Sequence, residues 1–146
     1  EVNEIKSLIQ KFENSKKNIN KNDNFNFSKL NDILPVGRVN IKSINTDELK
    51  TGILLSLKND TILKTPKSSL VVYADFFKGY GKMIILDLGS GYHLIFSGLN
   101  KIACKTGDWL EKGSTIGSIN VNNNEIVYME FRFKGKTINP SRWARS

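Results

Sequence analysis

Two short apolar runs joined by a glycine turn constrain this chain more than any other feature. Residues 83–88 and 92–96 are rich in β-branched and aliphatic side chains, and each run is too short for an ordinary helix. Gly89-Ser90-Gly91 between them supplies residues that tolerate positive φ in a tight turn. The segment therefore predicts a β-hairpin. Because its first run is nearly all apolar, we expect that strand to lie inside a sheet, covered on both faces.

Further strands are predicted on both sides of this hairpin. Short runs with a period of two are separated by Gly, Asn, Asp, Ser and Pro, and no helical pattern appears after about residue 30. The predicted strands are residues 53–57, 61–64, 70–77, 82–88, 92–97, 115–120 and 126–133. The fold class that follows is mainly β, an antiparallel β-sheet domain.

The N-terminal segment has a helical pattern instead. A three–four spacing of apolar residues predicts an amphipathic helix with a heptad-like seam, formed by Val2, Ile5, Ile9, Phe12 and Ile19. Residues 15–26 are mostly Lys, Asn and Asp and offer almost nothing to bury, which is typical of a linker. We therefore expect a helical arm and linker at residues 1–26, as the end of a coiled coil, and a separate domain at 27–146. The pattern leaves open whether the helix packs on that domain or continues a longer coil.

Composition and charge exclude several classes of function. The net charge is +8, but the Lys residues are spread along the chain and no nucleic-acid motif accompanies them, so we expect no nucleic-acid partner. A lysine-rich solvated surface explains the charge, and attraction to an anionic cell wall is the functional alternative. No run approaches the length that crosses a bilayer, so we expect no membrane span in this sequence. Cys104 is the only cysteine, which excludes an internal disulfide framework.

Catalytic chemistry has few candidate residues in this chain. His93 is the only histidine, whereas a catalytic zinc site generally has three protein ligands, mostly His with a carboxylate. Ser-His-Asp catalysis would also need His93, and no nucleophile elbow is present. We therefore expect no enzyme activity, no metal and no cofactor.

The last long strand predicted carries two different faces. Val127, Met129, Phe131 and Phe133 alternate along it and predict a core face. The other face mixes apolar, aromatic and charged side chains, namely Ile126, Tyr128, Glu130, Arg132 and Lys134. Such a mixture is typical of a surface that binds a partner, but the periodicity alone favours an ordinary solvated face with a stray Tyr and Ile.

Several motifs, in their order and spacing, resemble the LytM domain of zinc peptidoglycan endopeptidases, peptidase family M23. The similarity covers residues 34–143. It rests on Val72-Tyr73-Ala74-Asp75, Lys78-Gly79-Tyr80-Gly81, the hairpin, the stretch from Gly107-Asp108-Trp109 to Gly117, and the ending from Tyr128-Met129-Glu130 through Asn139-Pro140 to Trp143. The resemblance implies an antiparallel LytM-like domain that follows an N-terminal amphipathic helix.

The zinc ligands of that family do not carry over to this sequence. Lys50 and Leu54 stand at the His and Asp positions of the family's His-x-Gly-Ile-Asp element. Ile126 and Tyr128 stand at the two positions of its His-x-His pair, and Gly98 stands where a further histidine is found. The resemblance therefore implies a degenerate domain that lacks the zinc ligands.

Degenerate LytM domains form a subgroup, and this chain is most similar to the EnvC-type division factors. Tyr128, followed by Glu130 and Arg132, is shared with them. The resemblance implies a non-catalytic activator of periplasmic N-acetylmuramoyl-L-alanine amidases, acting in septal peptidoglycan splitting in the cell envelope of a Gram-negative bacterium. It also implies recruitment by the FtsE–FtsX complex through the upstream coiled coil. The alternative is a peptidoglycan-binding or scaffolding domain of the cell envelope.

The activator hypothesis predicts a metal-free groove that holds the regulatory helix of the amidase. We expect eight residues to form it: Lys50, Leu54, Tyr80, Phe96, Gly98, Ile126, Tyr128 and Arg132. Ile126, Tyr128 and Arg132 share a strand face by the period of two. The resemblance implies the other positions, because the family's ligands converge on one metal and the hairpin ends border the same cleft.

Overall fold

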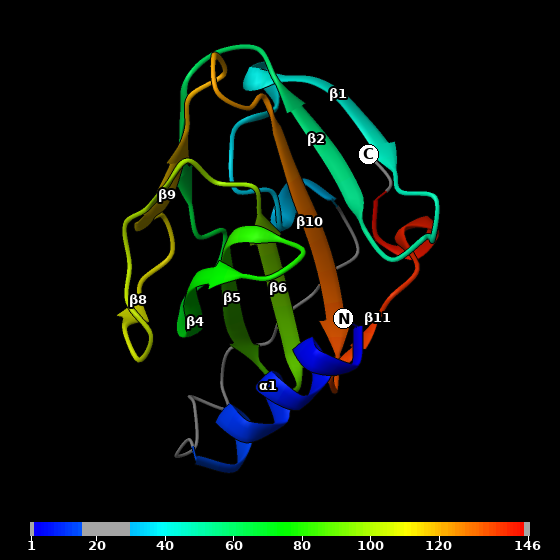
Figure 1. The fold of residues 1–146 in the computed structure, drawn as a ribbon, viewed down its shortest axis with the longest axis vertical. Coiled ribbons are helices and arrows are strands. Elements are labelled where there is room, and N and C mark those ends of the chain that lie inside the picture. Colours follow the sequence, from blue (N-terminus) through cyan, green and yellow to red (C-terminus); the bar gives the residue numbers. More distant parts are fainter. Residues whose placement is uncertain (1, 16–29, 145–146) are drawn as a thin grey trace.

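The computed structural model describes residues 2–15 and 30–144. One α-helix precedes a series of strands and three short 3-10 helices (Figure 1). The elements are α1 (Val2–Ser15), η1 (Leu30–Asp32), η2 (Arg38–Asn40), β1 (Ile41–Thr46), β2 (Ile53–Leu57), β3 (Thr61–Lys64), β4 (Ser69–Phe77), β5 (Gly81–Gly89), β6 (Tyr92–Ser97), β7 (Lys101–Ile102), β8 (Trp109–Leu110), β9 (Thr115–Ile119), β10 (Ile126–Phe133), β11 (Lys136–Thr137) and η3 (Pro140–Arg142).

The strands form two antiparallel sheets, as the sequence pattern predicts. The main sheet has the order β1-β2-β10-β6-β5-β4-β8, with β11 paired to β10, and the smaller sheet has the order β3-β9-β7. The predicted hairpin is formed by β5 and β6, and β5 lies inside the sheet between β6 and β4. The predictions of a mainly β fold and of a central hairpin strand are therefore confirmed.

Four strands were not predicted, for two reasons. β7, β8 and β11 have two residues each, too few to show a period. β1 lies at the edge of the main sheet and pairs only with β2, and its side chains are largely exposed. An edge strand with little to bury has no hydrophobic alternation to read.

The inner face of the main sheet carries the larger hydrophobic core. Met129 and Phe131 of β10 lie in it together with Phe96 of β6, and all three side chains are fully buried. The smaller sheet closes this core with Leu63 of β3 and with residues of β9. This face therefore has the continuous apolar packing that makes a domain stable.

The outer face of the same sheet is partly covered by α1. Ile5 and Ile9 of the helix are fully buried against Ile85 and Ile95 of the hairpin. Figure 1 shows α1 crossing the ends of β5, β6 and β10. The helix therefore packs on the domain through its N-terminal half, the first of the two possibilities that its apolar seam left open.

The boundary that we expect at residues 26–27 lies outside the described residues. Within the described ranges, no helix has the length and apolar character needed to cross a membrane.

Candidate functional site

A groove is hollowed into the outer face of the main sheet, beside the part that α1 covers. It has a volume of about 410 Å³ and opens to solvent. Three strands (β2, β6 and β10) and the turns that join β1 to β2 and β4 to β5 contribute its walls. The lining residues are Asp47, Leu49, Thr51, Leu54, Gly79, Tyr80, Ser97, Gly98, Asn124, Ile126 and Tyr128.

The floor of the groove is set by the pairing of β2 with β10. Leu54 lies directly opposite Tyr128 in this antiparallel pair, and Ile126 lies two residues further along β10 on the same face. Side chains directly opposite each other have Cβ atoms about 5 Å apart, so Leu54 and Tyr128 are in direct contact range. The Tyr80 ring, from the turn after β4, lies 6.2 Å from the Tyr128 ring between centroids.

Gly52 makes room for Tyr128. A Cβ atom at Gly52 would lie 2.7 Å from the hydroxyl oxygen of Tyr128 and 2.5 Å from the backbone oxygen of Met129. Both distances are shorter than a carbon atom tolerates, so only glycine fits at this position. The close approach of the β1–β2 turn to β10 therefore fixes the Tyr128 side chain against the turn.

A chain of side-chain hydrogen bonds runs from the rim of the groove into the buried sheet. The Thr51 hydroxyl lies 2.5 Å from a carboxylate oxygen of Asp47 and 2.9 Å from the Tyr128 hydroxyl, so its single proton serves one of these acceptors at a time. Tyr128 donates to a carboxylate oxygen of Glu130 at 2.7 Å. The bond to Glu130 thus orients the Tyr128 ring in the groove, and Thr51 adds a second bond when its proton turns to the Tyr128 hydroxyl.

A buried ion pair follows Tyr128 on the same face of β10. Arg132 donates from Nε to Glu130 at 2.7 Å and from a terminal nitrogen to the backbone oxygen of Gly135 at 3.0 Å. Both charged side chains are almost fully buried. Next to them in the sheet, His93 pairs in register with Arg132, and its Nε2 lies 3.6 Å from a carboxylate oxygen of buried Asp87. The buried charges of Glu130 and Arg132 are stable because they are paired with each other.

The electrostatics of this chain keep Tyr128 protonated. Burial raises the pKa of the Tyr128 hydroxyl, and the nearby charge of Glu130 raises it further. At the rim, burial raises the pKa of Asp47, but hydrogen bonds from Thr51 and Gly52 outweigh it, so the net pKa is lowered. At neutral pH the groove therefore presents a neutral phenol beside a carboxylate at its rim.

Comparison with known proteins adds the family. The model of peptidase family M23 matches residues 48–140, which covers the hairpin, the groove and most of the strands. The chain belongs to peptidase family M23. The LytM-like character predicted from the motifs is confirmed, and the matched part of the chain runs from the β1–β2 turn to η3.

Two curated relatives of this M23 chain carry names, and one of the two names refers to murein hydrolases. Protein NlpD/LppB homolog of Buchnera aphidicola is 30% identical over 135 residues, which is 85% of this chain and 40% of that protein. Murein hydrolase activator EnvC of Escherichia coli is 24% identical over 95 residues, which is 63% of this chain and 23% of that protein. The chain thus spans less than half the length of either relative.

A solved structure shares the fold over nearly the whole chain. A protein of Pseudomonas aeruginosa, described as an M23 peptidase, superimposes with a TM-score of 0.65 at 15% identity, covering 94% of this chain and 58% of the other. At this identity the likeness concerns the fold alone. It places the antiparallel sheet of this chain among M23 domains.

The zinc chemistry of the family does not fit the residues of this M23 groove. Leu54 and Ile126 have no lone pairs for a metal, and the Tyr128 hydroxyl is engaged with Thr51 and Glu130. Within residues 2–15 and 30–144, no group of three or more His, Cys, Asp or Glu side chains could hold a metal ion. No catalytic step through a metal can therefore be derived at this site.

The structure brings together most of the residues predicted for the groove. Leu54, Tyr80, Gly98, Ile126 and Tyr128 all line it. Gly98 adopts a positive φ of 87°, and a Cβ there would lie 3.0 Å from the backbone oxygen of Ile126, so glycine is required at this wall.

Phe96 and Arg132 are fully buried and do not line the groove, and Lys50 is not among the lining residues. Phe96 pairs with Met129 and faces the inner core, because it lies on the opposite side of β6 from the groove. Arg132 shares the face of Tyr128 but is fully buried beneath its neighbours. Lys50 lies exposed in the β1–β2 turn with a φ of 57°, while the neighbouring Leu49 and Thr51 face the groove.

Sequence reasoning missed several lining residues. Ser97 occupies the place expected for Phe96, and strand register alone reveals this, because Ser97 lies opposite Tyr128. The β1–β2 turn contributes Asp47, Leu49 and Thr51. The match of Gly52-Ile53 to the family element was the one signal that pointed to this turn.

Proposed function

We propose that this domain is a non-catalytic activator of N-acetylmuramoyl-L-alanine amidases in septal peptidoglycan splitting, and that it binds the regulatory helix of the amidase in the groove. The observation that carries the proposal is the side-chain chemistry at the family's ligand positions. Two aliphatic side chains and a hydrogen-bonded tyrosine replace metal ligands there, in a groove that is still open. A catalytic cavity has thereby become a surface suited to holding a protein segment.

The groove has the features of a protein-binding surface. Leu49 at its rim is 78% exposed and Ile126 is 39% exposed, so apolar area remains to be buried. Tyr80 and Tyr128 add aromatic area with polar ends, and tyrosine is enriched among the residues that dominate binding energies. An amphipathic helix that lays its apolar face in such a groove follows a common recognition mode. Each well-packed anchor contributes on the order of 1–3 kcal/mol.

The name of one relative supports a role as an activator of murein hydrolases. One is named a murein hydrolase activator, and the chain covers about a quarter of it, at 23% of its length. By this likeness we assign the domain to the periplasm of a Gram-negative bacterium. Recruitment by the FtsE–FtsX complex through a coiled coil upstream of the domain belongs to the same proposal.

A dye-release assay tests the proposal directly. Labelled peptidoglycan is incubated with a purified N-acetylmuramoyl-L-alanine amidase, with this chain, and with both together. We expect release only when both are present, because the chain lacks a hydrolytic centre and the amidase needs its activator. Release by the chain alone would contradict the non-catalytic assignment, and no stimulation by the chain with any amidase of the same organism would contradict the activator assignment.

A further inference from the structure

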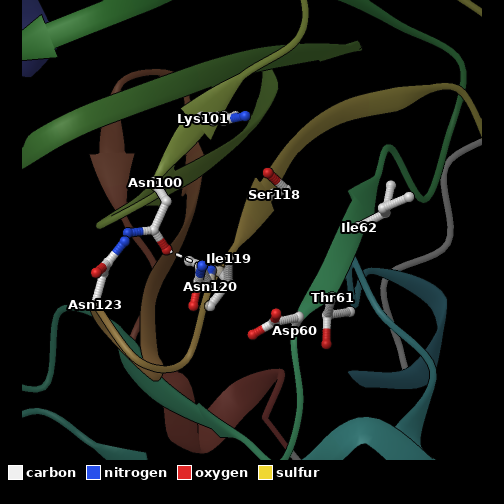
Figure 2. A pocket seen from close by; sticks show the side chains of 9 residues that line it. All are labelled: Asp60, Thr61, Ile62, Asn100, Lys101, Ser118, Ile119, Asn120 and Asn123. Carbon is white, nitrogen blue, oxygen red and sulfur yellow. Dashed lines mark hydrogen bonds between the residues drawn. The ribbon is translucent and has the colours of Figure 1, made fainter.

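A second hollow is lined by residues of β3, β7 and β9 of the smaller sheet and of the loops at their ends. It has a volume of about 380 Å³, within the range of small-molecule sites. Figure 2 shows its side chains arranged around an open centre. We call it the asparagine hollow, after three of its lining residues; the lining comprises Asp60, Thr61, Ile62, Asn100, Lys101, Ser118, Ile119, Asn120 and Asn123.

Three polar side chains of this hollow are fixed by backbone N–H groups. The Asn100 side-chain oxygen accepts from the backbone nitrogen of Asn120 at 2.6 Å, the dashed line of Figure 2. Asp60 accepts through one carboxylate oxygen from the backbone of Val121 at 3.0 Å, and the Asn120 oxygen accepts from the backbone of Asn122 at 3.1 Å. Two of these bonds join segments far apart in the sequence, so the side chains are held in place before any ligand arrives.

The same bonds determine what each side chain still offers. Backbone N–H groups bond the side-chain oxygens of Asn100 and Asn120, and the NH₂ group of each side chain is able to donate to a ligand. Asp60 keeps its second carboxylate oxygen as an acceptor. In Figure 2 the Ser118 hydroxyl and the Lys101 amine lie on the opposite side from Asp60. The hollow thus presents donors and acceptors together.

The charges of the lining favour a neutral ligand. Asp60 and Lys101 are its only charged members and have opposite signs. A metal cation would find a single carboxylate beside the Lys101 amine, and an anion would find that amine beside Asp60. Ile62, which is 57% exposed, adds an apolar wall. Fixed donors and acceptors beside an aliphatic surface match a sugar ring, which has hydroxyl groups around its edge and C–H groups on its face.

We propose that the asparagine hollow is a binding site for a neutral saccharide. The site goes beyond amidase activation and does not depend on it. The asparagine hollow lies next to the groove. Gly98 and Asn124 line the groove, and their near neighbours in sequence, Asn100 and Asn123, line the asparagine hollow. The Asn124 amide donates to the backbone oxygens of Gly98 and Ile126. A saccharide bound here lies beside whatever occupies the groove.

An NMR titration of the 146-residue chain tests the site. The probes are a β-1,4-linked tetramer of N-acetylglucosamine and the corresponding glucose tetramer, added to protein labelled with ¹⁵N. We expect saturable shifts, with at least one of the two, for the side-chain NH₂ signals of Asn100 and Asn120 and for backbone amides at 60–62 and 118–123. A dissociation constant near or below about 1 mM is expected for a site with this few contacts. Shifts that stay linear up to several millimolar with both sugars would overturn the proposal.

Two isosteric variants isolate the ligand-facing atoms. Asp60→Asn and Asn100→Asp each retain the oxygen that accepts the backbone bond and exchange only the opposite atom, so the fold is preserved while an acceptor becomes a donor or the reverse. We expect each to weaken saccharide binding about tenfold or more. The matched control is Asp108→Asn, because Asp108 also accepts a backbone bond, from Lys105, but lies outside the hollow. Unchanged binding in both variants, or equal binding of a blocked tetra-alanine peptide, would refute a saccharide site.

Discussion

The two faces of the main sheet come from the same strands but bury different chemistry. On the inner face, alternate residues of β6 and β10 pack in the hydrophobic core, as Phe96 and Met129 do. On the outer face the next residues along the same strands form an apolar strip under α1, a buried charged cluster and the open groove. The comparison suggests that the inner face maintains the fold, while the outer face can change its chemistry within an intact M23 domain.

The largest loss of stability is expected when Phe131 on the inner face is shortened. This side chain is fully buried on the inner face, with its ring 6.0 Å from that of Trp143 and 5.4 Å from that of Tyr92. Phe131→Ala should lower the free energy of unfolding by about 3–5 kcal/mol, because it leaves a cavity. Phe133→Ala, two residues on at a position that is 37% exposed, is the matched control and should cost less than about 1 kcal/mol. Chemical denaturation measures both free energies of unfolding. Equal losses in the two variants would contradict a special role of the buried inner face in stability.

The next effect concerns the charged cluster of the outer face. Arg132→Met should lower the free energy of unfolding by about 3 kcal/mol, since it leaves Glu130 buried without its cation while methionine retains most of the volume. The double variant with Glu130→Leu should recover part of this loss, because no buried charge is then left alone. A single variant as stable as the native chain would show that the ion pair adds nothing to the outer face.

A smaller effect is expected where α1 covers the outer face. Ile9→Ala should lower the free energy of unfolding by about 2 kcal/mol, near the lower limit for such a change, because a surface helix can shift to fill part of the space. Gln10→Ala changes an exposed neighbour on the same helix and should stay within about 0.5 kcal/mol. If both variants melt like the native chain, the contact of α1 with the sheet contributes nothing to stability.

A substitution in the groove is expected to abolish function and to leave stability nearly unchanged. Leu54→Glu places a carboxylate where a partner helix would bury it, so amidase-dependent dye release should fall to the level of amidase alone. The free energy of unfolding should change by less than about 1 kcal/mol, because Leu54 is only half-buried. Val39→Glu, at a site 79% exposed outside the groove, should activate normally. Full activation by a folded Leu54→Glu variant would exclude the groove as the docking surface.

The smallest effect is a pH dependence from Asp47. Its folded pKa is lowered relative to the unfolded chain, so its contribution to stability is complete above the unfolded value of about 3.9 and is lost as the pH falls through the folded value. The native chain should therefore lose more stability between pH 5 and pH 3 than Asp47→Asn does. Thermal melts across this range measure the difference. If the melting temperatures of the two proteins fall equally with pH, Asp47 makes no contribution to the pH dependence of stability.

The sequence pattern predicted strands well where one face of a strand is consistently apolar. The bounds predicted for 53–57, 61–64, 92–97 and 126–133 coincide with β2, β3, β6 and β10. The orientation of β6 was less readable, because His93, Ile95 and Ser97 on one face and Leu94 and Phe96 on the other are all buried. With both faces buried, alternation gives no sign of which face is the groove, and Phe96 was misplaced for that reason.

Arg132 was misplaced because its burial depends on residues distant in the sequence. Its side chain reaches the backbone of Gly135, and a Cβ at Gly135 would lie 3.2 Å from the Lys6 side chain of α1. A period of two assigns Arg132 correctly to the face of Tyr128. It contains no information that a helix more than a hundred positions earlier covers that end of the strand.

By itself the sequence determined the mainly β fold and the likeness to the M23 family, because both depend on local alternation or on residue identity at spaced positions. The tertiary structure alone decided which of the residues on one face remain open. Leu54, Ile126 and Tyr128 line a groove, whereas Glu130 and Arg132 on the same face are enclosed. The physical reason is that exposure is set by what packs above a side chain, and those neighbours are brought there only by the folded chain.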